Sequence, residues 1–129
     1  MGQGERTDIA LVKRARHGLG DSIDLLIDAG LAWDTKTAIQ RARAFADSNI
    51  FWLEEPLRPD DYKGYRKLSE ATPVRIAAGE EESNRYSYIN LMDRGRIDVL
   101  QSIPHDVASC RSLITALPLT LMSLLLCIG

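Results

Sequence analysis

The stretch Phe51-Trp-Leu-Glu-Glu-Pro56 is an apolar run that ends in two carboxylates and a proline. Aromatic and aliphatic residues at 50–53 predict a short buried strand, because the run is too short for a helix. Pro56 has no N–H to give to a sheet ladder, so the strand must end before it. The acids therefore follow the carboxyl end of a strand, where α/β proteins place their functional residues.

Two more apolar runs end in the same way. Ile23-Asp-Leu-Leu-Ile-Asp28 ends in an aspartate, and Val74-Arg-Ile-Ala-Ala-Gly-Glu80 ends in a glutamate. Asp28, Glu54 and Glu80 are evenly spaced, 26 residues apart each time. This regularity predicts repeated strand–helix units with an acid at the same end of each strand.

Helical spacing of apolar residues predicts helices between these strands. Their expected N-caps are Thr7 or Asp8, then Asp34, then Ser83 or Asn84, and a further helix starts at 59–60. Glu81 and Glu82 are expected to be first-turn acids of the last helix. A fourth strand is expected at 97–101.

Strands that alternate with helices imply parallel pairing with right-handed crossovers. We therefore predict an α/β fold, a partial (β/α)8 TIM-type barrel of three to four units, over residues 1–101. A complete barrel of this kind takes about 250 residues. A small flavodoxin-like domain is the less favoured alternative, because the chain lacks a glycine-rich phosphate loop.

Residues 102–129 do not continue this pattern. No charged residue occurs from 112 to 129, and Pro118 interrupts any helix there. The apolar run is too short for a comfortable membrane span of about 20 residues. We expect an atypical apolar C-terminal tail, and its abrupt start suggests a reading-frame change or a rearranged terminus.

Bulk properties exclude several classes of function. The chain has 129 residues and a net charge of −2, so it offers no basic field for nucleic acid and no polybasic membrane patch. Cys110 and Cys127 have neither metal-ligand spacing nor a disulfide framework around them. With no secretory signal at the start of the sequence, we expect a cytoplasmic location.

Asp28, Glu54 and Glu80 suit a metal ion. Neighbouring strands lie about 4.8 Å apart, so three carboxylates at their ends would repel one another and raise one another's pKa values. A hard divalent cation such as Mg²⁺ resolves this repulsion, and the absence of histidine or cysteine nearby counts against zinc. The alternative is that each is an ordinary solvated acid in a β/α loop.

These stretches resemble the mandelate racemase/muconate lactonizing enzyme group of the enolase superfamily. The matching motifs lie at 27–33, ending in Trp33, at 52–57 and at 78–80. The resemblance implies that Asp28, Glu54 and Glu80 are Mg²⁺ ligands at the ends of the third, fourth and fifth barrel strands. Glu55 and Trp33, in the same motifs, are candidates for supporting these ligands, although Glu55 could equally face away.

Enzymes of this group abstract a proton α to a carboxylate and stabilise the enediolate on the metal. The acid-sugar dehydratases look most similar, so the resemblance implies a small acid-sugar or other carboxylate substrate. The sequence departs from the family where a catalytic aspartate is expected, at about position 103, which is Ile103. The paired lysines would lie before Met1 and the partner histidine beyond Gly129.

We therefore predict a fragment of a Mg²⁺-dependent dehydratase or racemase that binds metal but is catalytically incomplete. No catalytic residue is assigned, and whether the chain is itself an enzyme stays open. The alternative is a non-catalytic interaction protein, because an incomplete barrel exposes strand edges and the tail is apolar. Association of identical chains is compatible with both.

Overall fold

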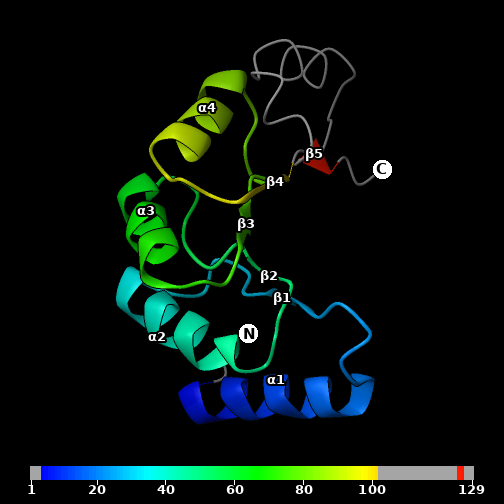
Figure 1. The fold of residues 1–129 in the computed structure, drawn as a ribbon. Coiled ribbons are helices and arrows are strands. Elements are labelled where there is room, and N and C mark those ends of the chain that lie inside the picture. The colour runs from blue at the N-terminus through cyan, green and yellow to red at the C-terminus, as the bar shows by residue number, and fades with distance from the viewer. Residues whose placement is uncertain (1–3, 102–124, 127–129) are drawn as a thin grey trace.

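Strands and helices alternate along the chain in this computed structural model, which describes residues 4–101 and 125–126. The helices are α1 (Glu5–Leu19), α2 (Thr35–Ala46), α3 (Tyr62–Ala71) and α4 (Arg85–Asp93). The strands are β1 (Leu26–Asp28), β2 (Trp52–Glu54), β3 (Ile76–Ala78), β4 (Val99–Gln101) and β5 (Leu125–Leu126) (Figure 1). The predicted order of a helix, three strand–helix units and a strand is confirmed for residues 4–101. Apart from β5, the predicted tail lies outside the described residues.

All five strands form one sheet in the order β1-β2-β3-β4-β5, and every neighbouring pair is parallel. Asp28 is the register partner of Glu54, and Glu54 is the partner of Ala77. The carboxyl ends of β1, β2 and β3 therefore meet at one edge of the sheet. The strands are shorter than the apolar runs that predicted them.

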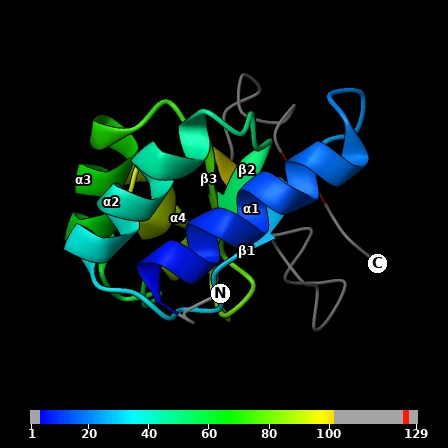
Figure 2. The same ribbon diagram turned by 90° about the horizontal axis from the view of Figure 1, so that it is seen from below.

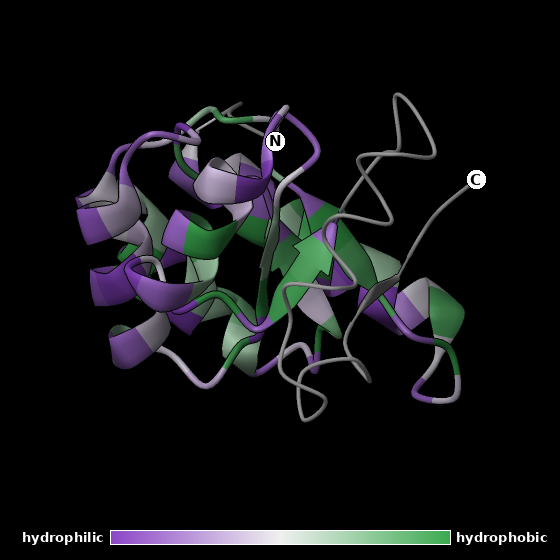
Figure 3. Ribbon diagram, turned by 90° about the horizontal axis from the view of Figure 1, so that it is seen from above, coloured by the Kyte–Doolittle hydropathy of each residue, from purple (hydrophilic) through white to green (hydrophobic). Residues whose placement is uncertain are grey.

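One face of the sheet packs against all four helices. Its buried residues include, from strands and helices together, Ile27, Leu53, Ile76, Leu100, Val12, Phe45, Leu68 and Leu91. The opposite face carries a separate small cluster of Trp52, Ala77 and Val99. The strands are mostly hydrophobic, whereas the helices carry both hydrophobic and hydrophilic residues (Figure 3). Helices on one face only, in the described part of the chain, are typical of a β/α barrel, whereas doubly wound sheets have them on both faces.

Side-chain caps start three of the helices. Asp34 accepts a hydrogen bond from Thr37 N at 2.8 Å, and Asn84 caps α4 in the same manner, both as predicted. The α3 cap is Asp61, whose carboxylate accepts from Gly64 N at 2.9 Å, slightly later than the predicted start. These caps satisfy N–H groups that have no partner inside the helix.

Helix α1 begins earlier than predicted. Gly4 is its N-cap and makes no side-chain cap bond, so the expected cap at Thr7 or Asp8 is wrong. Asp8 lies within α1 and is fully buried, and its carboxylate accepts a hydrogen bond from Arg41 Nε of α2 at 3.2 Å. The Asp8 carboxylate therefore forms a long-range ion pair with Arg41 instead of capping a helix, and local sequence cannot reveal such a pair.

This buried pair attaches α1 to the rest of the fold. Arg41 is 5% exposed, lies 3.7 Å from the Glu5 carboxylate, and places its guanidinium 5.9 Å from the centre of the Trp33 ring. Figure 2 shows α1 lying beside α2 near β1. None of the helices in residues 4–101 is long and apolar enough to cross a membrane.

Candidate metal centre

Three acids lie at the carboxyl-end edge of the sheet, on consecutive strands. Asp28 is the last residue of β1, Glu54 is the last residue of β2, and Glu80 follows the last residue of β3 by two positions. Asp28 and Glu54 are directly paired in register. Their strand positions place them next to each other, since parallel neighbours are about 4.8 Å apart.

The charges of these acids act on one another. Partial burial raises the pKa of Glu80, and the negative charges of Glu54 and Asp28 raise it further. Repulsion of this kind is expected where carboxylates converge without a compensating cation. Glu80 therefore lies within the electrostatic reach of both other acids.

Each of the other two acids already has a local partner. Asp28 Oδ1 accepts a hydrogen bond from Gly30 N at 2.8 Å, and Glu54 Oε2 accepts from Trp52 Nε1 at 3.0 Å. Each bond occupies one carboxylate oxygen. Across residues 4–101 and 125–126, no three acid, histidine or cysteine side chains are gathered closely enough to hold a metal ion.

The donor chemistry nevertheless fits Mg²⁺, which prefers carboxylate oxygens and keeps several waters. Asp28 is exposed, and Glu54 and Glu80 are partly exposed, so solvent reaches all three carboxylates. The backbone thus places the three acids at neighbouring strand ends, but their side chains do not converge on one point in the described residues.

Glu55 does not face away from this edge. It is 1% exposed, and its Oε1 accepts hydrogen bonds from Gly79 N at 2.7 Å and Glu80 N at 3.2 Å. Burial raises its pKa, while the two backbone N–H groups lower it. Its φ of 41° lies in the left-handed region, which non-glycine residues seldom adopt. A strained backbone and a buried acid at this point mark a constrained junction between β2 and β3.

Gly79 is enclosed on its other side by β4. Its φ is 128°, and a Cβ there would lie 2.5 Å from the Gln101 carbonyl oxygen. No other residue fits this combination of conformation and space. The peptide between Ala78 and Glu80 is therefore fixed by close packing as well as by hydrogen bonds.

Trp33 supports the loop after β1 from the helical side. Its backbone N donates to Pro56 O at 3.2 Å, and its ring packs against Phe45 with centroids 6.3 Å apart. The ring is 8% exposed and belongs to the core shared with the helices. The side chain of Trp33 thus stabilises the loop that follows Asp28.

The predicted role of Glu81 and Glu82 as first-turn acids is wrong. Helix α4 starts at Arg85 and has no acid in its first turn. Glu82 is 8% exposed in the preceding loop, where its carbonyl oxygen accepts a hydrogen bond from Tyr88 Oη at 2.7 Å. The Asn84 cap separates both glutamates from the helix.

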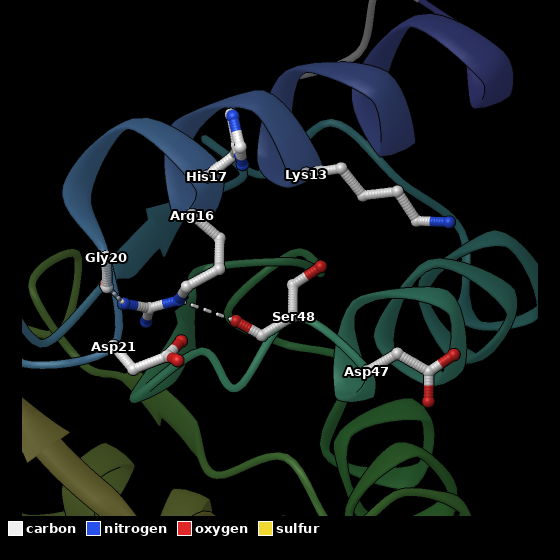
Figure 4. Close-up of a pocket in the computed structure, with 7 residues that line it drawn as sticks. All are labelled: Lys13, Arg16, His17, Gly20, Asp21, Asp47 and Ser48. Carbon is white, nitrogen blue, oxygen red and sulfur yellow. Dashed lines mark hydrogen bonds between the residues drawn. The ribbon is translucent and has the colours of Figure 1, made fainter.

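A cavity of about 500 Å³ lies between the end of α1 and the end of α2. The segments that line it precede β1 and β2, whereas the three acids lie at or just after the carboxyl ends of β1, β2 and β3. Arg16 crosses the cavity and donates to Ser48 O at 2.9 Å and to Gly20 O at 2.7 Å (Figure 4). Exposed His17 lies beside it, in the last turn of α1. Because the Arg16 guanidinium is already bound to backbone carbonyls, this cavity is a structural junction.

Parallel strands with helices on one face of the sheet define a β/α-barrel type of protein, a class in which functional residues lie at the carboxyl ends of the strands. The sequence model of the family described as "Enolase C-terminal domain-like" matches residues 1–117. The chain therefore belongs to this family, and the predicted resemblance to the enolase superfamily is confirmed.

Individual relatives agree. The L-rhamnonate dehydratase of Saccharopolyspora erythraea is 35% identical over 101 residues, covering 77% of this chain and 26% of that protein. The 3,6-anhydro-D-galactonate cycloisomerase of Zobellia galactanivorans superposes with a TM-score of 0.88 at 27% identity, covering 100% of this chain and 37% of that one. The L-talarate dehydratase of Polaromonas sp., solved with Mg and L-glucarate, gives 0.83 at 29% identity over 89% of this chain and 33% of that one. The chain spans about a quarter of the length of the curated relatives it matches.

Proposed function

We propose that this chain forms the metal-binding part of a Mg²⁺-dependent enolase-superfamily enzyme that acts on an acid sugar or a similar carboxylate. The observation that supports this most directly is the placement of Asp28, Glu54 and Glu80 at three consecutive parallel strand ends. The relative solved with Mg and L-glucarate supports the choice of metal and of substrate class. The comparisons do not favour the alternative of a non-catalytic interaction protein.

A bound Mg²⁺ supplies a concentrated positive charge that stabilises negative charge developing on a substrate carboxylate. In this proposal Asp28, Glu54 and Glu80 provide the oxygens that hold it. Trp52 keeps the Glu54 side chain at the edge through its Nε1 hydrogen bond. The carbon acid beside a carboxylate also needs a base, and that role is not assigned to a residue of this chain.

Magnesium should stabilise the folded protein. A ligand that binds only the folded state at 100 times its Kd adds about 2.7 kcal/mol to the free energy of unfolding. We expect urea unfolding in MgCl₂ to shift to higher midpoints, and the shift to disappear with EDTA. NaCl at equal ionic strength is the control for screening, and equal midpoints in the two salts would contradict metal binding.

Turnover of acid sugars should be undetectable for these 129 residues. Ile103 stands where the family resemblance places a catalytic aspartate, and a hydrocarbon side chain accepts no proton. General acid–base groups contribute about 10²–10⁴-fold to a rate, and here the reaction itself is a proton abstraction. Incubation of the protein with Mg²⁺ and galactarate, followed by NMR, should show unchanged substrate. Product formation that EDTA abolishes would overturn the proposed incompleteness.

A further inference from the structure

We propose that Glu55 is a positioning residue for the proposed metal ligand Glu80: its buried carboxylate holds the 78–80 backbone so that Glu80 faces the other two acids. This inference rests on the proposed function, because it assigns a role within the same site. Its evidence is a set of contacts that converge on one residue between β2 and β3.

The side chain of Glu55 binds the strand end that bears Glu80. Its Oε1 lies 2.7 Å from Gly79 N and 3.2 Å from Glu80 N, so one oxygen receives two consecutive backbone donors. At 1% exposure, water has little access to satisfy this carboxylate. Charge-assisted bonds to backbone N–H groups are about twice as strong as neutral ones, so the 79–80 peptide has one strongly preferred position.

The backbone of Glu55 binds strand β3 and the loop that follows β1. Its N–H donates to Ala77 O of β3 at 3.0 Å, and its carbonyl oxygen accepts from Leu31 N at 2.7 Å, in the loop that follows Asp28. Residue 55 therefore joins the loop after β1, the end of β2 and the end of β3. All three proposed ligands are attached to segments that meet at this residue.

The left-handed backbone at Glu55 explains how adjacent glutamates serve different purposes. In an extended strand, neighbouring side chains point to opposite faces. The φ of 41° ends β2 immediately after Glu54, and the Glu55 carboxylate reaches sideways to the neighbouring strand end. Such a conformation is costly for a residue with a Cβ and persists only where its surroundings enforce it.

Tyr65 completes the surroundings of this carboxylate. Its Oη donates to Leu57 O at 2.8 Å and lies 3.5 Å from Glu55 Oε2. Because its one proton points to Leu57, the phenol oxygen remains able to accept. A glutamine at 55 can therefore keep its amide oxygen on the two N–H groups and direct its amide nitrogen to Tyr65, whereas an alanine provides neither contact.

The test compares Glu55→Ala and Glu55→Gln by Mg²⁺ calorimetry at a temperature where circular dichroism shows both to be folded. Residues that orient metal ligands typically cost 10–100-fold in metal affinity when removed, so we expect a loss of about that size for Glu55→Ala. Glu55→Gln should stay within about threefold of the wild type, since its hydrogen bonds are retained. Glu81→Ala, which removes an exposed carboxylate beside Glu80, is the matched control and should change little because exposed charges are screened.

A folded Glu55→Ala protein that binds Mg²⁺ as well as the wild type would overturn the proposal. If Glu55 only stabilised the fold, both variants would unfold at lower urea concentrations than the wild type. The folded Glu55→Ala and Glu55→Gln proteins would then bind Mg²⁺ with equal affinity.

Amide hydrogen exchange of the metal-free wild type provides a test that needs no variant. The Gly79 N–H should exchange at least about tenfold more slowly than an unstructured peptide, because its acceptor is buried. Exchange of Gly79 at the unstructured rate would overturn the anchoring. If the wild type binds no Mg²⁺, the proposed function fails, while the exchange result still decides whether Glu55 fixes this peptide.

Discussion

Replacing Gly79 by alanine should lower the free energy of unfolding by about 3–5 kcal/mol, a loss at the upper end for a single substitution. Two effects add. A φ of 128° is strained for any residue with a Cβ, and the new Cβ would lie 2.5 Å from the Gln101 carbonyl oxygen. That oxygen belongs to the backbone of β4, so relief requires the strand itself to move. Urea unfolding followed by tryptophan fluorescence measures the loss.

Two other glycines separate these effects. Gly30 has a φ of 59° with no atom within 4 Å of an added Cβ, so Gly30→Ala should cost only about 1–2 kcal/mol, from backbone conformation alone. Gly18 lies inside α1, also with free space, and Gly18→Ala should stabilise by about 0.5–1 kcal/mol. If Gly79→Ala lowered the free energy of unfolding no more than Gly30→Ala does, the close packing of residue 79 against β4 would be contradicted.

The second large effect is expected at Glu54. Glu54→Gln should weaken Mg²⁺ binding at least about 100-fold, equivalent to about 2.8 kcal/mol, because loss of a direct ligand should exceed the 10–100-fold typical of supporting residues. The amide oxygen of glutamine can still accept from Trp52 Nε1, so the local structure is retained.

The same substitution should not destabilise the metal-free protein. Glu54 contributes to the repulsion felt by Glu80, and removing its charge relieves part of that repulsion. Solvent screens these partly exposed groups, so the gain is expected to be small. Lower metal affinity together with unchanged or slightly higher metal-free stability distinguishes a ligand from a structural residue. A marked loss of metal-free stability would contradict this assignment.

The sequence predicted the sheet because strand ends are local features. Apolar runs that stop in acid at 28, 54 and 80 located three strands and their common edge, and the periodicity between them located the helices. The family resemblance followed from the same motifs. The repeated order alone implied parallel pairing, and the equal spacing of the acids favoured a barrel over an open sheet.

Long-range contacts could not be predicted in this way. Asp8 has the sequence context of an N-cap, and only the packing of α1 on α2 brings it to Arg41. Glu55 looked identical to its neighbour Glu54, and its bonds to Gly79 and Glu80 join residues 24 and 25 positions apart. The proline at 56 was the available signal that the chain turns there, but it does not indicate the direction of the turn.

Calorimetric titration of Mg²⁺ into the wild type, Glu54→Gln and the Glu81→Gln control tests most directly whether Asp28, Glu54 and Glu80 together bind the metal. We expect one ion per chain for the wild type and for Glu81→Gln, and no measurable binding by Glu54→Gln at the same concentrations. Absence of binding by the wild type, or equal binding by Glu54→Gln, would contradict the three-carboxylate metal site.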